Sequence, residues 1–264
     1  MTTMRWLKRV MLVFSLVFLL PLALHAAWWL SQERPASWSQ ADWGSAGLLA
    51  PAGAHEPALV RIYAARVGRW RGIFAHHTWV VVKEKGAPRY TRYDVVGWGT
   101  PVRTDNWAPD GRWFGQAPDV VAALDGPEAE ALVPRIRAAV AAYPWGSPGG
   151  YQAWPGPNSN TFVNAVLAAI PEAGVALPPT ALGKDFRAEG LFAGLTPTRT
   201  GVQVVWRGLI GASIGWIEGV ELNVLGLVAG VDLRRPAVKL PGFGRIGWPT
   251  APAPGTAAAA ENEP

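Results

Sequence analysis

The chain has 264 residues, of which half are hydrophobic and only 16% are charged. Typical soluble domains carry roughly a quarter of charged residues, so this composition indicates membrane association or a large buried fraction. The sequence has no cysteine, which excludes disulfides, thiolate metal sites and a cysteine nucleophile. The net charge of +5 is scattered and forms no basic stripe with aromatic residues, which argues against a nucleic-acid partner.

Residues 1–30 are expected to hold the chain at a membrane. The stretch from Val10 to Leu30 has no charged residue, and as a helix it would extend about 30 Å, the thickness of a bilayer core. Arg5, Lys8 and Arg9 precede it, which favours a cytoplasmic N-terminus and an extracytoplasmic (periplasmic) domain. A cleaved signal peptide is the alternative, although the best cleavage site, around His25, fits the small-residue rule poorly.

Three further segments follow this anchor. Residues 31–56 are rich in Pro, Ser, Gly and Ala and contain three tryptophans, which predicts a linker over the membrane or the domain surface. Residues 57–248 are predicted to form the domain. Residues 249–264 combine alanines, prolines and acidic residues and are predicted to be a disordered tail.

The first part of the domain is predicted to be β-structure. Residues 58–65, 78–82 and 90–98 are rich in strand-forming residues and are bounded by turn residues. The short connection between the second and third stretches predicts an antiparallel hairpin. Residues 100–120 contain Pro, Gly and Trp without a clear period and are predicted to be a loop.

The register of this hairpin decides which side chains are neighbours. If Lys83 pairs near Tyr90, Asp94 lies opposite Trp79, on the face that carries His77 and diagonal to it. A slip of one residue would move Asp94 to the other face, because strand side chains alternate.

Two helices are predicted next. The sequence Asp125-Gly126-Pro127-Glu128 is typical of a helix start. Because Pro134 interrupts the helical period, we expect a short first turn and then a helix over residues 134–143. A loop with four prolines and four glycines, residues 144–157, leads into a second helix that ends at Pro171.

Residues 202–231 are apolar and long enough for a second membrane span. Their glycines are spaced as in packed membrane helices, but Arg207, Glu218 and Glu221 would be costly inside a bilayer. Strands and tight turns that pack on the core or on the membrane face are therefore favoured.

Ser159 stands where the glycine-rich loop meets the second helix. A serine flanked by Asn158, Asn160 and Thr161 is typical of a helix cap, because these side chains accept hydrogen bonds from the free N–H groups. The alternative is a nucleophile, but a helix terminus alone is too weak to ionise a hydroxyl, so a neighbouring base would be needed.

His76 and His77 form the only internal histidine pair and open the second predicted strand. Their side chains are expected on opposite faces of that strand, so a metal site made by both is not expected. No cofactor is expected either.

The two motifs together resemble a known group of domains. A His-Thr pair at a strand start, followed by a helix opened by Asn-Ser-Asn-Thr-Phe, is similar to the circularly permuted papain-like domains, which include the NlpC/P60 and lecithin retinol acyltransferase-like groups. Residues 55–248, including Glu218-Gly219-Val220-Glu221-Leu222-Asn223, also resemble an uncharacterised bacterial envelope family of unknown function. The nucleophilic cysteine of the papain-like enzymes is Ser159 in this chain.

This resemblance implies an α+β fold, an antiparallel sheet with packed short helices, outside the membrane. It also implies roles for individual residues: Ser159 as nucleophile, His77 as general base and Asp94 as the group that orients His77. Gln152 would supply an oxyanion donor in addition to a backbone N–H.

Asn158, Asn160, His76 and Trp79 are candidates for substrate contacts. The expected function is therefore a hydrolase or acyltransferase acting on an envelope amide or ester, such as a peptidoglycan peptide or a lipid. The alternative is a non-catalytic envelope protein that uses the same fold for binding or scaffolding.

Overall fold

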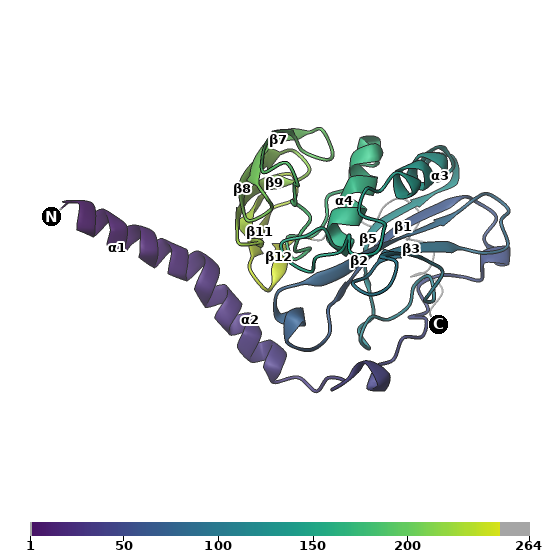
Figure 1. Cartoon of the computed structure of the whole chain (residues 1–264), viewed down its shortest axis with the longest axis horizontal. Coiled ribbons are helices and arrows are strands. Elements are labelled where there is room, and N and C mark those ends of the chain that lie inside the picture. Colours follow the sequence, from purple (N-terminus) through teal and green to yellow (C-terminus); the bar gives the residue numbers. More distant parts are fainter. Residues whose placement is uncertain (1, 249–264) are drawn as a thin grey trace.

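Two antiparallel sheets, a few helices and a long N-terminal helix make up the chain (Figure 1). The computed structural model describes residues 2–248, so the predicted tail lies outside the described residues. The α+β class and the N-terminal apolar helix are confirmed. The division of the strands into two separate sheets was not predicted.

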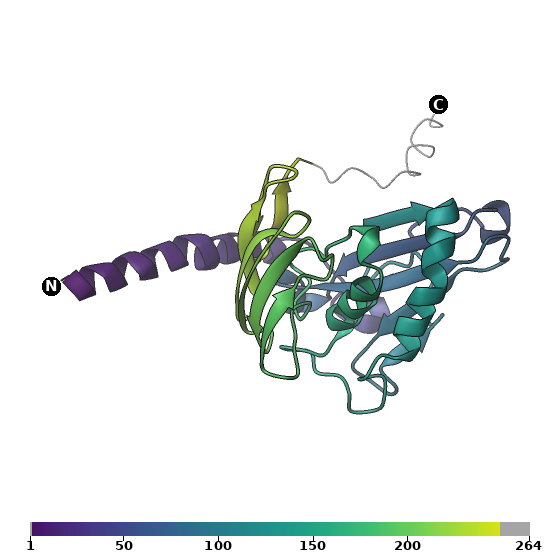
Figure 2. The same ribbon diagram turned by 90° about the horizontal axis from the view of Figure 1, so that it is seen from above.

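The N-terminal helix consists of α1 (Thr2–Phe14), the π-helical segment η1 (Ser15–Leu19) and α2 (Leu20–Leu30). Within residues 2–248 it is the one helix that is long and apolar enough to cross a membrane. Its buried residues recur every three or four positions and are Phe18, Pro21, His25 and Trp29. The second half of the helix therefore packs along the body, whereas α1 projects away from it (Figures 1 and 2).

The linker that follows lies over the domain surface, which is one of the two locations predicted for it. It contains two short 3₁₀ turns, η2 (Trp38–Gln40) and η3 (Ala52–Ala54). The ring of Trp43 lies 5.1 Å from the ring of Trp113, so the linker covers part of the fold.

The first sheet has five strands in the order β4-β3-β2-β1-β5. Their bounds are β1 (Leu59–Arg66), β2 (His76–Lys83), β3 (Thr91–Val95), β4 (Val102–Thr104) and β5 (Asp119–Asp125), and a 3₁₀ turn, η4 (Arg69–Ile73), joins β1 to β2. The three predicted strands are confirmed. The loop prediction for residues 100–120 was wrong in part, because β4 and the start of β5 lie there; β5 pairs with β1, about 60 residues away, which no local pattern indicates.

The predicted register of the hairpin is observed. Val80 pairs with Tyr93 and Val82 with Thr91, and the same register places Asp94 opposite Trp79. His77 and Asp94 therefore project from the same face of the sheet, which fixes one half of the predicted site.

Two helices cover the opposite face: α3 (Gly126–Ala141), on β1 and β5, and α4 (Ser159–Ala169), on β2 and β3. The predicted break at Pro134 was wrong, because α3 runs through it without interruption. The proline removes a hydrogen bond to the carbonyl of Glu130, and both residues lie on the solvent side, where water can take its place. A short turn, η5 (Pro171–Ala173), follows α4.

Both faces of the five-stranded sheet are buried. The face under α3 and α4 carries the main core, with Val60, Ile62, Val80 and Val82 packed against Phe162. The other face carries a second cluster that is rich in aromatic residues: Leu59, Tyr63, Ala65, Trp79, Val81, Val96 and Trp113. A side chain of β2 therefore belongs to one of these two environments.

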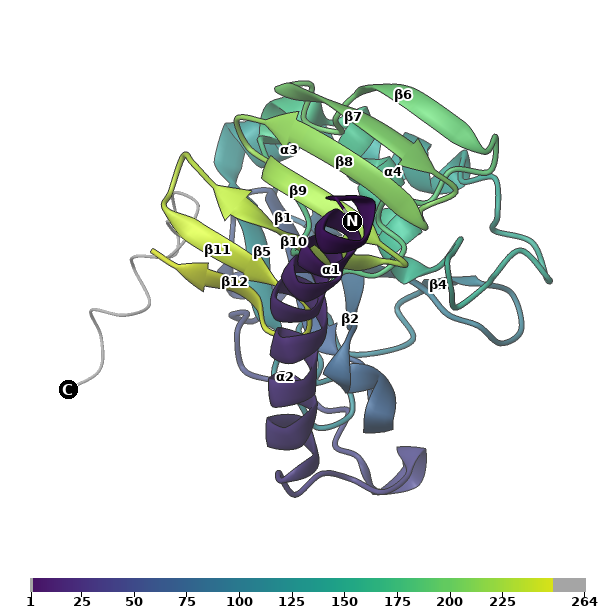
Figure 3. The same cartoon turned by 90° about the vertical axis from the view of Figure 1, so that its left-hand side faces the viewer.

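The second sheet has seven strands in the order β12-β11-β10-β9-β8-β7-β6. Their bounds are β6 (Leu191–Leu195), β7 (Gly201–Trp206), β8 (Ile210–Gly215), β9 (Gly219–Val224), β10 (Leu227–Asp232), β11 (Ala237–Leu240) and β12 (Gly244–Gly247). Strands and tight turns over residues 202–231 are confirmed, and this region has no second membrane span. Figure 3 shows this sheet from the side from which α1 projects.

Candidate functional site

The start of α4 is capped by Asn158, not by Ser159. Asn158 Oδ1 accepts hydrogen bonds from the backbone N–H groups of Asn160 (2.9 Å) and Thr161 (3.2 Å). The backbone N–H of Asn158 in turn donates to Thr161 Oγ1 at 3.1 Å, which completes a capping box. Ser159 is the first helical residue. A cap was predicted at this place and is present, but the capping residue is Asn158 and not Ser159.

The same polar side chains join two loops to the helix. Asn158 Nδ2 donates to the carbonyls of Ala153 and Leu182, both at 3.0 Å. Thr161 Oγ1 donates to Gly183 O at 2.7 Å. Gly183 has a φ of +90°, and a Cβ there would lie 2.3 Å from Asn158 Nδ2, so this position needs a glycine.

Asn160 connects α4 to β2. Its Nδ2 donates to His76 O (2.9 Å) and to Leu182 O (2.7 Å), and its Oδ1 accepts from Thr78 Oγ1 (2.9 Å). Thr78 Oγ1 also lies 3.4 Å from Ser159 O. The β2 side chain that contacts the first turn of α4 is therefore a hydroxyl group and not an imidazole.

His77 lies on the other face of β2. Its ring stacks on Trp113, with ring centroids 3.8 Å apart and planes inclined by 11°. Its Nε2 lies 2.8 Å from Asp94 Oδ1, so the predicted contact between these two residues is present. Because successive strand side chains point to opposite faces, His77 faces the aromatic cluster while Thr78 faces α4.

Arg92 completes this buried polar group. Its guanidinium donates to Asp94 Oδ2 (2.6 Å) and Oδ1 (3.0 Å) and lies 4.1 Å from the ring centroid of Trp79. Burial opposes the ionisation of Asp94, but the charge of Arg92 and the hydrogen bonds from His77 and Arg92 outweigh it and lower the pKa of Asp94. Burial lowers the pKa of His77, so its ring is neutral.

The predicted Ser159–His77 pair is not brought together. Ser159 is buried at the start of α4, and its Oγ forms no hydrogen bond with any residue from 2 to 248. The five-stranded sheet lies between this serine and the ring of His77. The sequence could not indicate this, because alternation separates two faces without saying which one a helix will cover.

His76 is the histidine on the α4 side of β2. Its Nδ1 is buried without a hydrogen-bond partner in the described chain, and its Nε2 lies 3.8 Å from Asp119 Oδ2. Burial and the nearby charge of Arg66 lower the pKa of His76 to about 3. At neutral pH the ring is therefore uncharged.

The two remaining predicted site residues are Gln152 and Trp79. Gln152 is exposed on the glycine-rich loop, and its backbone N–H donates to Pro157 O at 2.8 Å. Trp79 is buried in the aromatic cluster and donates from Nε1 to Pro109 O at 2.9 Å. The Trp79 side chain therefore donates to a loop carbonyl and not to Ser159.

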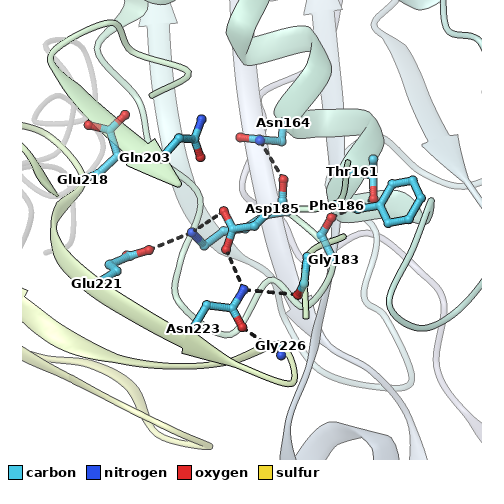
Figure 4. A network of polar contacts seen from close by, with 12 residues as sticks. Thr161, Asn164, Gly183, Asp185, Phe186, Gln203, Glu218, Glu221, Asn223 and Gly226 are labelled. Carbon is cyan, nitrogen blue, oxygen red and sulfur yellow. Dashed lines mark hydrogen bonds and ion pairs between the residues drawn. The ribbon is translucent and has the colours of Figure 1, made fainter. Parts of the chain in front are cut away.

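A second buried polar network joins the loop after α4 to the inner face of the seven-stranded sheet. Lys184 Nζ donates to Glu221 Oε2 (2.7 Å) and Lys239 Nζ to Glu221 Oε1 (2.6 Å), so one carboxylate binds two ammonium groups. Asn223 Nδ2 donates to Asp185 Oδ2 at 3.1 Å (Figure 4). Burial opposes the ionisation of Glu221, but the two lysines lower its pKa.

These network residues were not predicted as a group. Glu218 and Glu221 stood out in the sequence as acids that disfavour a membrane helix, but their partners Lys184 and Lys239 lie 37 and 18 residues from Glu221. Within residues 2–248, no group of three or more His, Asp or Glu residues is placed to hold a metal ion.

Comparison with known proteins gives a family of unknown function. The chain shows no significant match to curated proteins or to solved structures. Residues 57–186, which include the five-stranded sheet, α3, α4 and the start of the Lys184 network, are similar to the family described as "Protein of unknown function (DUF3750)".

Proposed function

We propose that this chain is a non-catalytic, membrane-anchored protein of the cell envelope with a binding or scaffolding role. The observation that carries this proposal is the placement of His77, whose ring stacks on Trp113 on the side of the sheet away from α4. A serine nucleophile requires a base within hydrogen-bond reach, and this histidine is not available to Ser159.

The hydrogen bonds around α4 support a structural role for its polar residues. The side chains of Asn158, Asn160 and Thr161 bind the carbonyls of four neighbouring residues, and all three are buried. Such side chains fasten loops and leave few donors for a substrate. Thr78, which contacts this turn from β2, cannot act as a base at neutral pH.

The extracytoplasmic position rests on the charge of the N-terminus. Arg5, Lys8 and Arg9 all lie on α1, before the apolar part of the helix, and no acidic residue occurs in this segment. Basic residues favour the cytoplasmic end of a membrane helix, so the folded part would lie on the outer side.

A second candidate function is a hydrolase or acyltransferase on an envelope amide or ester, on a permuted papain-like fold. One observation favours it: Ser159 Oγ has no partner among residues 2–248, at the positive end of α4, and His76 on the same face has an unpaired Nδ1. In this candidate His76 would replace His77 as the base. A pKa of about 3 makes His76 a weak base, which is why this function ranks second.

Labelling of membranes with a fluorophosphonate probe tests both. The first proposal predicts no labelling of the wild-type chain in membranes where a known serine hydrolase is labelled. Labelling that is lost in both Ser159→Ala and His76→Ala, with an unchanged melting temperature, would overturn it in favour of the second candidate. Loss in His77→Ala as well would restore the pair expected from the sequence.

A further inference from the structure

The outer face of the seven-stranded sheet is entirely apolar. In each strand the residues with one parity point away from the body, and the pairing register aligns them across the sheet. From β6 to β12 these outward residues are Leu191, Ala193, Leu195, Val202, Val204, Trp206, Ile210, Ala212, Ile214, Val220, Leu222, Val224, Leu227, Ala229, Val231, Val238, Leu240 and Ile246. None of them is polar.

Many of these side chains are open to the surroundings. Val204 is 51% exposed, Ile214 57% and Leu222 48%, although they occupy central strands. Antiparallel sheets in water place their apolar face on the core and their polar face outward. A contiguous apolar surface of this kind marks an interaction site.

The opposite, inner face carries the polar residues. Gln203, Glu221, Asn223 and Lys239 project from it and are buried against the body. The sheet is therefore inverted: its buried side is polar, and its free side is hydrocarbon. Such a pattern fits an exterior that is itself apolar.

The membrane helix leaves the body at this same face. Val17 and Phe18 of η1 line one side of an open groove of about 740 Å³, whose other wall is formed by β7 to β10, mostly by their outward residues. Phe18 is buried there, whereas residues 3–13 of α1 are exposed. Figure 3 shows the helix in front of the sheet, so a bilayer that surrounds α1 would also meet this surface.

The rim of the sheet has the charge expected next to lipid headgroups. Arg199, Arg207 and Arg234 are exposed in the turns between strands. The acidic residues between positions 191 and 248 are buried or paired: Glu218 and Glu221 are buried, and Asp232 binds Arg245. Trp216 is 61% exposed in the turn between β8 and β9, where an interfacial tryptophan is favoured.

We propose that the outer face of the seven-stranded sheet is a lipid-binding surface that rests on the membrane in which the N-terminal helix is anchored. The edge strands β6 and β12 have backbone groups that hydrocarbon cannot satisfy. The sheet therefore lies at the boundary between headgroups and acyl chains, where amphipathic surfaces bind. The exposed arginines contact anionic headgroups around it.

Because the chain has no cysteine, single labels can be placed on either side of the fold without removing native residues. Val204→Cys and Ile214→Cys report on the outer face, and Glu130→Cys, exposed on α3, is the matched control. Each full-length variant is labelled with an environment-sensitive fluorophore and reconstituted into vesicles that contain lipids with a nitroxide near the headgroup or near the chain end.

The expected result is strong quenching of both outer-face labels by the shallow nitroxide, weaker quenching by the deep one, and background quenching at Glu130→Cys. Outer-face labels that behave like the control would overturn the proposal. So would outer-face labels that escape both lipids but crosslink between copies in a concentration-dependent manner, because the face would then be covered by a second chain.

Discussion

The two sheets of this protein differ in which of their faces is buried. Protein covers both faces of the five-stranded sheet: helices pack on one side, and a tryptophan-rich cluster lies on the other. The seven-stranded sheet turns its polar face inward, where Lys184 and Lys239 bind Glu221, and leaves its apolar face open. The same alternation of side chains therefore produces a core in one sheet and an exterior in the other.

This difference shows that a strand pattern identifies two faces but not their surroundings. In water the apolar face of an antiparallel sheet packs on the core. Next to a bilayer the opposite assignment becomes favourable, provided that each inward charge has a partner.

Removal of the carboxylate at the centre of the inner face should have the largest effect. Glu221→Ala leaves two ammonium groups buried without their shared partner, and losing one member of such a group costs about 3–5 kcal/mol. Thermal or denaturant unfolding in a mild detergent measures this loss. Glu84→Ala, which breaks the exposed pair with Arg137, is the control and should cost about 0–1 kcal/mol. Equal losses in the two variants would contradict the role of the network.

Acid should loosen the five-stranded sheet before the seven-stranded one. Burial lowers the pKa of His76 and His77, so the unfolded chain binds more protons than the folded chain below about pH 6.5. The stabilisation by the two neutral rings is complete above that pH and is lost as the pH falls. The pKa of Glu221 is also lowered, by Lys184 and Lys239 against the effect of burial, so its contribution persists until the pH nears about 4.3.

Hydrogen exchange at pH 7 and pH 5, corrected for intrinsic rates, measures this difference. Protection in β2 should fall more than protection in β9, and the double variant His76→Gln/His77→Gln should remove the difference. Parallel loss in both strands would mean that the histidines do not control the acid response.

A pair of strand valines tests whether the seven-stranded sheet has its apolar face outward. Val80 is fully buried in β2, and Val204 is 51% exposed in β7. Val80→Thr buries a hydroxyl group in the core and should cost about 1–3 kcal/mol. Val204→Thr should change the free energy of unfolding in detergent by no more than about 0.5 kcal/mol. A large loss at Val204 would show that this face is packed against protein.

The smallest effect concerns the start of α4. Asn158→Ala removes the helix cap together with the hydrogen bonds to Ala153 and Leu182, and should cost about 1–2 kcal/mol. Ser159→Ala removes an Oγ without hydrogen bonds inside the described chain and should change the free energy of unfolding by no more than about 0.5 kcal/mol. Chemical unfolding of the two variants measures both changes in the free energy of unfolding. A larger loss in Ser159→Ala than in Asn158→Ala would show that the serine caps the helix.

Local physics made much of the fold predictable. The pairing of Val80 with Tyr93 followed from a short turn and alternating side chains, and α4 followed from its apolar period and polar start. The missed features depend on distant partners. β5 is defined by pairing with β1, and the buried Glu221 is explained only by two lysines from other elements.

The candidate site shows the same limit. The neighbourhood of His77 and Asp94 was predictable, because both residues belong to one hairpin. The relation of His77 to Ser159 was not, because it depends on which face of the sheet α4 covers.

The N-terminal helix also determines how the protein moves. Phe18, Pro21, His25 and Trp29 pack along the body, so no free segment separates the apolar helix from the fold. A flexible linker would let the domain move freely above a bilayer. In the proposed membrane-anchored protein, this helix would hold the domain at a fixed height and orientation, so a partner would bind it at the membrane surface.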